Sequence, residues 1–254
     1  MHRRHGTAGH SGLANARCAD RTDAMKTDKH KRRRGDGDTE SRGQSTRTSI
    51  LDSAEILFGQ RGYDGASTRD IAGMAQVRLG LLHYHFGTKD KILAATFDRK
   101  LDALRDLIQT SFDNAAAAGE LGLDDCVRAF IVPFLAISAD KSHDLHSFVI
   151  MTSHLMSSYR SPDVRPNLTR LSPISEIFTS RVRAVCPAAR EEDLLTSTYL
   201  IEAALIFMVQ DPGFLDDISA HQHSADRLDL IAESTLRFFS TGLRALIDPP
   251  SPNC

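Results

Sequence analysis

A chain of 254 residues exceeds one average domain, which favours a small domain joined to a larger one, or one large fold behind a tail. Hydrophobic residues make up 41% and charged residues 25%, as in packed globular proteins, and no apolar run reaches the roughly 18 residues of a membrane span, which excludes a membrane protein. The net charge of -2 conceals an asymmetry, since residues 1–45 carry 11 basic and 6 acidic side chains, whereas residues 101–254 carry 12 basic and 21 acidic ones. Only the N-terminal part of the chain is therefore expected to bind a polyanion.

The cysteines lie far apart and show no CxxC spacing, which argues against a zinc site and against a disulfide scaffold. They are Cys18, Cys126, Cys186 and Cys254. We therefore expect a cytoplasmic protein that holds no structural metal and no other cofactor.

Residues 1–45 have few apolar side chains and include the basic cluster KHKRRRG. Nothing there offsets the entropy of ordering, so we predict a disordered basic tail. No apolar segment follows the Arg-rich opening, which excludes a secretory signal. A start of translation at Met25 is an alternative for this part of the chain.

Regular structure is predicted to begin near Arg47, where the segment RTSILDSAEILFGQRGY starts. Its apolar residues recur at i, i+4, i+7 and i+8, which is typical of an amphipathic helix. These residues are Ile50, Ala54, Leu57 and Phe58. Gly62 is expected to end this first helix.

Two short helices are predicted next, the first capped by Ser67 or Thr68 and the second over residues 79–85. Neither reaches the ~12 residues that an isolated helix needs, so both must pack on their neighbours. Two such helices joined by a tight turn form a helix-turn-helix, whose second helix enters the major groove of DNA. Phosphate contacts would supply most of the affinity and the exposed side chains of the second helix would supply the sequence preference.

Residues 47–93 resemble the DNA-binding domain of the TetR/AcrR family of transcription regulators. The similarity lies in the segments ILDSAEILFGQRGY, STRDIA and LLHYHFGTKDKIL, the last of which is similar to the family's Leu-Tyr-x-His-Phe-x-x-Lys-x-x-Leu. The resemblance implies an all-α protein: a helix-turn-helix domain of three helices at residues 46–92 and a larger helical domain for effector binding and dimerisation at residues 93–248. Residues 249–254 would be a C-terminal tail.

The resemblance also implies which residues meet double-stranded DNA, expected to be a palindromic operator. Thr68 and Lys89 would contact phosphates, and Thr88 would cap the fourth helix. The complete expected interface is Arg47, Thr68, Arg69, Arg78, Leu79, Gly80, Leu81, His83, Tyr84 and Lys89. The basic tail either adds phosphate contacts beside this interface or stays solvated.

Three residues depart from the family pattern. Gln76 stands where the family usually has Gly, so the turn is expected to hold a left-handed non-Gly residue at a cost on the order of 1 kcal/mol. Arg78 replaces the usual Ser or Thr cap, and His83 replaces the usual Tyr, which would make a phosphate contact there sensitive to pH. Packing remains an alternative role for Tyr84 and His85.

The rest of the chain is predicted to be helical, because no alternating strand pattern occurs. A fourth helix over residues 89–112 would link the two domains and end before NAAAAGELGL. Apolar stripes then predict helices within residues 126–137, 145–159 and 171–185, the first kinked at Pro133.

The last two predicted helices, at residues 191–209 and 226–247, present more apolar surface than one subunit is expected to cover. Between residues 194 and 209 the one charged side chain is Glu202. In TetR-like proteins the last two helices form a four-helix dimer interface, so we predict a homodimer.

These patterns predict a transcription repressor that a small molecule releases from its operator. The expected effector pocket is Phe130, Phe134, Phe148, Met151, His154, Leu155, Phe178 and Tyr199. One alternative is a metal- or redox-responsive switch that uses His143, His146 and Cys126, and another is an architectural DNA-binding protein without an effector. We expect no enzyme, because the sequence has no HExxH motif, no paired carboxylate-His motif and no Gly-rich phosphate loop.

Overall fold

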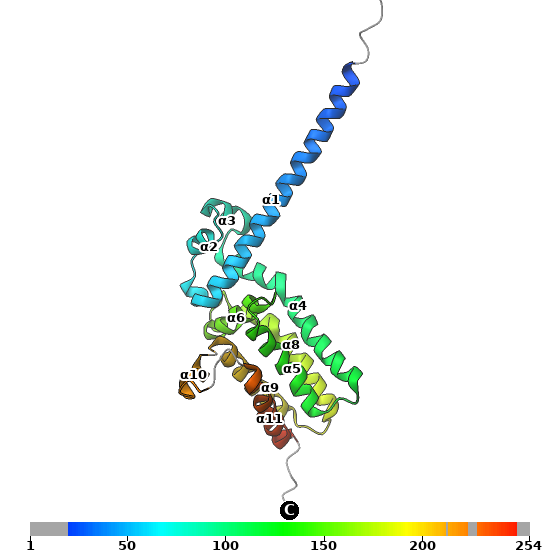
Figure 1. Cartoon of the computed structure of the whole chain (residues 1–254), viewed down its shortest axis with the longest axis vertical. Coiled ribbons are helices and arrows are strands. Elements are labelled where there is room, and N and C mark those ends of the chain that lie inside the picture. The colour runs from blue at the N-terminus through cyan, green and yellow to red at the C-terminus, as the bar shows by residue number, and fades with distance from the viewer. Residues whose placement is uncertain (1–19, 212, 223–227, 248–254) are drawn as a thin grey trace, which may run out of the picture. The chain divides into compact units, whose positions relative to one another are not determined.

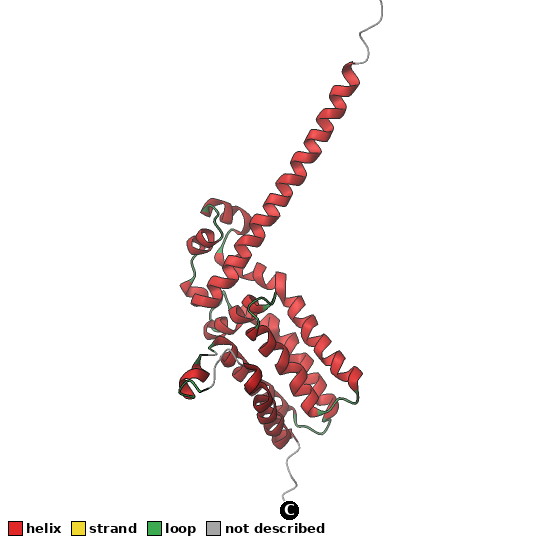
Figure 2. Cartoon of the chain, in the orientation of Figure 1, coloured by secondary structure: helices red, strands yellow, loops and turns green. Residues whose placement is uncertain are grey.

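The computed structural model describes residues 20–211, 213–222 and 228–247, although only the helical backbone is described for residues 20–40 and 228–230. Every regular element in these ranges is helical, which confirms the predicted all-α class (Figures 1 and 2). The predicted C-terminal tail at residues 249–254 and the first 19 residues of the basic tail lie outside the described residues.

Helix α1 (Asp20–Gly65) crosses the boundary between two compact units, Met1–Thr46 and Arg47–Cys254. The prediction of a disordered tail differs from the structure, in which residues 20–45 are helical. Helical hydrogen bonds close within the segment and need no apolar partner, so an apolar-poor sequence does not by itself exclude them. Among the side chains that are described, the core begins at Ile50, so the part of α1 that is packed is the part predicted from periodicity.

In the second unit, α1 packs with α2 (Thr68–Met74) and α3 (Leu79–Phe86) into the predicted helix-turn-helix. The apolar face of α1 that the sequence predicted is buried: Ile50, Ala54, Leu57 and Phe58. Gly62 interrupts α1 with φ 66, as its expected role at the helix end requires. Leu82 and Phe86 anchor α3 to this core.

Local bonds fix the turn between α2 and α3. Ser67 caps α2, because its hydroxyl accepts the Asp70 N–H at 3.1 Å while the Asp70 carboxylate accepts the Ser67 N–H at 3.1 Å. Gln76 has φ 56 in the turn, which confirms the expected left-handed residue. Arg78 occupies the N-cap position of α3 and makes no capping bond with its side chain.

Helix α4 (Lys89–Ala118) is longer than the predicted 89–112, because the Ala run that follows Asn114 continues it to Gly119. Beyond it, the described residues form five long helices and four short ones. The long helices are α5 (Leu123–Ala139), α6 (His146–Leu155), α8 (Ser172–Val185), α9 (Glu191–Gln210) and α11 (Leu228–Ile247). The short ones are η1 (Met156–Ser158), α7 (Arg165–Leu168), η2 (Thr169–Leu171) and α10 (Phe214–Ile218), too brief to show a periodic pattern.

The larger helical part is a bundle in which α4 packs on α5 and α8, and α9 packs on α6, α8 and α11 (Figure 1). Pro133 lies inside α5, which continues through it to Ala139. Large buried aromatic side chains fill the centre of the bundle. Among them, the Phe130 and Phe178 rings lie 4.8 Å apart between centroids, and those of Phe97 and Phe148 lie 5.3 Å apart.

Candidate functional site

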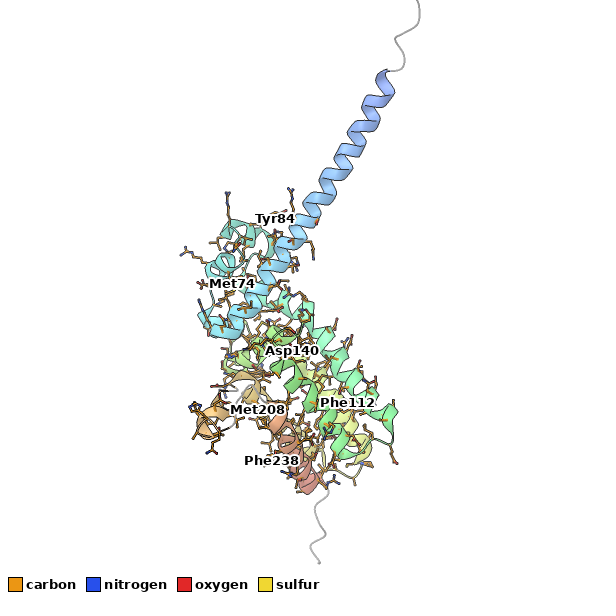
Figure 3. All side chains as sticks on the ribbon, viewed as in Figure 1. Met74, Tyr84, Phe112, Asp140, Met208 and Phe238 are labelled. Carbon is orange, nitrogen blue, oxygen red and sulfur yellow. The ribbon has the colours of Figure 1, made fainter. Side chains whose placement is uncertain are left out.

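The outer face of α3 is free in the protomer. Tyr84 is 84% exposed and Leu81 39% exposed, and Figure 3 shows Tyr84 projecting from the helix-turn-helix. Arg78, Gly80 and His83 are also exposed, whereas Leu79 is half-buried and packs against the core. The exposed face of α3 therefore contains five of the six residues expected from that helix and its cap.

The flanking residues expected at the interface differ in what they contact. Arg69 is exposed and Thr68 half-buried at the start of α2. The Arg47 guanidinium lies over the Phe86 ring at 4.5 Å from its centroid, which orients it at the start of the packed part of α1. His83 donates through Nδ1 to the Gly87 carbonyl oxygen at 2.6 Å, since a carbonyl only accepts, and this leaves Nε2 available.

Lys89 is engaged within the protein. Its Nζ donates to the carbonyl oxygens of Tyr63 at 2.9 Å and Ala66 at 3.2 Å, and lies 4.0 Å from the centroid of the Tyr63 ring. The ammonium group thus joins the start of α4 to the end of α1. Thr88 stands at the N-cap position of α4, as expected, but its side chain makes no capping bond to the α4 backbone.

A cavity of about 100 Å³ lies among α4, α5, α6, α8 and α9. Its lining is mostly apolar and includes three hydroxyl-bearing residues and one carboxylate. The residues are Leu104, Phe130, Phe134, Val149, Thr152, Ser153, Met156, Leu171, Ile174, Ser175, Glu202, Leu205, Ile206 and Val209. Burial raises the pKa of Glu202, and a side-chain hydrogen bond with Ser175 partly opposes that rise.

Two of the eight residues expected in the pocket, Phe130 and Phe134, line this cavity. Phe148, Met151, Leu155 and Phe178 are buried outside its lining, His154 is half-buried, and Tyr199 is 69% exposed. The sequence prediction chose the most apolar face of each helix, whereas the cavity is bordered by a neighbouring face of α6. Glu202, the one charged side chain between residues 194 and 209, was a sequence signal that could have indicated the cavity.

Two sequence-family models match this chain in order. Residues 50–96 match the model described as bacterial regulatory proteins, tetR family, and residues 128–242 match the model described as tetracyclin repressor-like, C-terminal domain. The chain belongs to the TetR family of transcriptional regulators. It is thus a member of a family of DNA-binding regulators and not of enzymes, and it binds DNA through the helix-turn-helix region that the first model matches.

Curated relatives match part of the chain. The Transposon Tn10 TetC protein of Escherichia coli is 36% identical over 70 residues, which are 28% of this chain and 36% of that protein. The HTH-type transcriptional repressor KstR2 of Rhodococcus jostii is 35% identical over 74 residues, 28% of this chain and 36% of that protein. The HTH-type transcriptional repressor Rv3405c of Mycobacterium tuberculosis is 46% identical over 50 residues, 20% of this chain and 27% of that protein. The matches therefore span about a third of the length of these relatives.

Solved structures share the TetR-type fold along most of the chain. FadR from Bacillus subtilis has a TM-score of 0.53 at 14% identity and covers 77% of this chain and 98% of its own. FadR from Bacillus halodurans has a TM-score of 0.55 at 16% identity, with 78% and 99% covered. At these identities the likeness concerns the fold. None of the helices within the described ranges is long and apolar enough to cross a membrane.

The residues of the metal- or redox-responsive alternative do not form a ligand set. The His143 Nδ1 accepts the Leu145 N–H at 3.1 Å, and the His146 Nδ1 lies 2.9 Å from the Ile137 carbonyl oxygen. Cys126 is buried, which raises the pKa of its thiol to about 12. In the part of the chain that the structure describes, no three His, Cys, Asp or Glu side chains come together as a metal site.

Large apolar side chains are exposed on the last two long helices of the TetR-type domain. On α9 they are Leu195, Tyr199, Leu200 and Phe207, and on α11 they include Phe238, which is 73% exposed. Figure 3 shows Phe238 at the outside of α11. The opposite face of α11, with Leu236, Leu243 and Ile247, is buried. In a single protomer this apolar surface of α9 and α11 is exposed, and it is the surface that the sequence analysis expected a second subunit to cover.

Proposed function

We propose that this TetR-family protein is a homodimeric repressor that binds a palindromic operator through α3 and leaves it when a small molecule enters the cavity. The observation that carries this proposal is the double role of α4. This helix supports the helix-turn-helix at Lys89 and lines the cavity at Leu104. The position of α4 can therefore depend on whether the cavity is occupied, and a shift of α4 would move α3.

Three successive residues of α4 attach it to different parts of the protein. Arg99 binds Asp52 of α1 at 2.7 Å and also pairs with the buried Glu55. Asp98 binds Arg170 of η2 at 2.7 Å, and Lys100 binds Asp144, just before α6, at 2.6 Å. One turn of α4 thus connects the DNA-binding helices to the segments that border the cavity.

A second connection runs through α6. Val149, Thr152 and Ser153 of α6 line the cavity. On the neighbouring face, Ile150 and Met151 approach Gly59 of α1 so closely that a Cβ there would lie 3.4 Å from the Ile150 Cγ2 and 3.5 Å from the Met151 backbone nitrogen. Displacement of α6 by a ligand would therefore press directly on the first helix of the DNA-binding domain.

The small size of the cavity supports two forms of the protein, one bound to the operator and one released from it. At about 100 Å³ it is well below the volume that ligand pockets usually have, roughly 300–1,000 Å³. A ligand can enter only if the surrounding helices move apart, and those helices hold α1. FadR from Bacillus subtilis, which shares this fold, was solved in complex with stearoyl-CoA. KstR2 and Rv3405c, which are similar to part of this chain, are repressors by name.

A mobility-shift titration with the DNA upstream of its own gene tests the proposal. The full-length protein should retard this fragment, and an unlabelled copy should compete while unrelated DNA should not. Changing the exposed Tyr84→Ala should weaken the specific complex at least ten-fold, whereas Tyr159→Ala, an exposed aromatic outside the helix-turn-helix, should not. Equal retention of upstream and unrelated DNA would overturn the repressor proposal.

A further inference from the structure

Among the described residues that line the cavity, Glu202 is the single ionisable side chain. Of the other lining residues, Thr152, Ser153 and Ser175 carry hydroxyl groups and the rest are apolar. No lining residue from α4, α5, α6, α8 or η2 is titratable. An ionised carboxylate enclosed by apolar side chains raises the free energy of the folded protein unless a partner compensates its charge. The position of Glu202 among these residues therefore indicates that it binds such a partner.

The protein itself supplies only part of that compensation. Within the described residues the one group that bonds Glu202 is the Ser175 hydroxyl of α8, and no cationic side chain acts on the carboxylate. A carboxylate has about four acceptor sites, so one hydroxyl leaves most of them unused. Several carboxylates of the described surface pair with a guanidinium group, as Glu191 does with Arg183, and Glu202 has no such partner among the described residues.

Aromatic rings border the same space. Phe130 and Phe134 both line the cavity, with their ring centroids 5.6 Å apart and the planes inclined at 66°. Ring faces attract cations, and a carboxylate does so more strongly. An anionic group would meet the half-buried Glu202, and no described lining residue carries a positive charge that would offset the repulsion.

We propose that Glu202 anchors the effector and that the effector is an apolar molecule carrying a protonated amine. The ammonium group would donate to the Glu202 carboxylate beside Ser175, while its apolar part would displace the side chains of the cavity. This inference rests on the proposed function, because it names the chemical class that the proposed effector site takes. It also distinguishes this site from one for fatty acids or phosphate esters, in which the buried charge would have the opposite sign.

A matched series of octylamine, octanol and octanoate tests the class of ligand. These compounds share one apolar chain and differ in the charge of the head group. We expect calorimetry with the full-length protein to give at least ten-fold tighter binding of octylamine than of octanol, and no detectable binding of octanoate. Release from operator DNA should follow the same order. The inference is overturned if the amine binds no tighter than the alcohol, or if none of the three binds.

The variant Glu202→Gln tests the anchor, because it keeps the shape of the side chain and removes the charge. It should lose at least ten-fold in affinity for octylamine while binding octanol as tightly as before, and Glu192→Gln, an exposed position on α9, should bind both as the wild type does. Undiminished amine affinity of Glu202→Gln would overturn the role of this residue. Specific operator binding without amine selectivity would overturn the inference and leave the proposed function standing, whereas loss of specific DNA binding by the wild type would overturn the proposed function itself.

Discussion

Glu202 shows how one side chain can link the proposed ligand site to the stability of the fold. Its pKa is raised by burial, so the folded protein binds this proton more tightly than the unfolded chain does. For an acid shifted in this direction, folding is favoured below the unfolded pKa of about 4.3, and that contribution is lost as the pH rises through the folded pKa. At neutral pH the ionised Glu202 therefore lowers the stability of the ligand-free protein.

The first prediction is that Glu202→Gln melts at a higher temperature than the wild type at pH 7 to 8. The difference should shrink as the pH falls and disappear below about pH 4, where the wild-type carboxyl is protonated in both states. Thermal unfolding followed by circular dichroism across this range measures it. A lower melting temperature of the variant at pH 8 would contradict the assignment of Glu202 to a costly, uncompensated position.

The second prediction concerns Lys89, which the family resemblance assigns to a phosphate and which bonds two carbonyl groups in the structure. Lys89→Ala should lower the free energy of unfolding by about 1–3 kcal/mol, because charged hydrogen bonds are lost. If the same ammonium also meets a phosphate, the slope of log affinity against log salt should flatten by roughly one unit per subunit. Lys91→Ala, two residues along and exposed, is the control for both measurements. An unchanged slope would remove Lys89 from the DNA interface and leave it a purely internal role.

At the scale of elements, the contact of α1 with α6 depends on the absence of a side chain at Gly59. The third prediction is that Gly59→Ala stays folded and gains about 0.5–1 kcal/mol, because its Cβ would meet α6 at ordinary contact distances and Ala favours a helix. Gly59→Leu should instead cost about 1–3 kcal/mol, since it forces α1 and α6 apart. Denaturant unfolding measures the stability, and operator titration shows whether the separation weakens DNA binding. Equal stability of the two variants would mean that α6 does not press on α1.

Several elements could be predicted because their signal is local. The face of α1 follows from its apolar spacing, the cap of α2 from Ser67, and the left-handed turn residue from the Gln76 departure. The cavity could not be predicted in this way, because its walls come from five long helices and two short ones whose mutual rotation depends on packing. A shift of one residue on α6 separates the predicted Phe148 from the observed Val149, and that shift turns a side chain by 100°. The internal bonds of Lys89 join residues 26 and 23 positions apart, which no local pattern reveals.

At the scale of the whole molecule, the exposed apolar surface of α9 and α11 leads to the fourth prediction. Phe238→Glu should turn the dimer into folded monomers, because a charge in that interface would be buried without a partner at a cost of several kcal/mol. Unfolding is not expected, since Phe238 is exposed in the protomer. Sedimentation velocity and circular dichroism measure the two effects. Tyr159→Glu, the same kind of change outside α9 and α11, should leave the dimer intact, and a dimeric Phe238→Glu would place the interface elsewhere.

The fifth prediction concerns the basic cluster before Arg47. Deletion of residues 1–44 should leave the dimer and its melting temperature unchanged, because the described core begins at Ile50. If the segment contacts DNA, specific and non-specific binding should weaken together, and more at low salt than at high salt. Equal affinity of the full-length and shortened proteins at low salt would show that the segment stays solvated.

If a ligand moves the cavity wall as proposed, the four ion pairs at residues 98–100 of α4 would let that helix tilt as a lever. Successive residues point about 100° apart, so bonds from Asp98, Arg99 and Lys100 hold the helix on several sides and resist rolling while allowing tilt. Taking Arg99 as the fulcrum, Leu104 lies about 7.5 Å along the axis on the cavity side and Lys89 about 15 Å on the other side, at 1.5 Å per residue. Because Lys89 lies twice as far from Arg99 as Leu104 does, tilting α4 about Arg99 moves Lys89 twice as far and in the opposite direction. A displacement of about 1 Å at the cavity wall would thus become about 2 Å at the base of the helix-turn-helix.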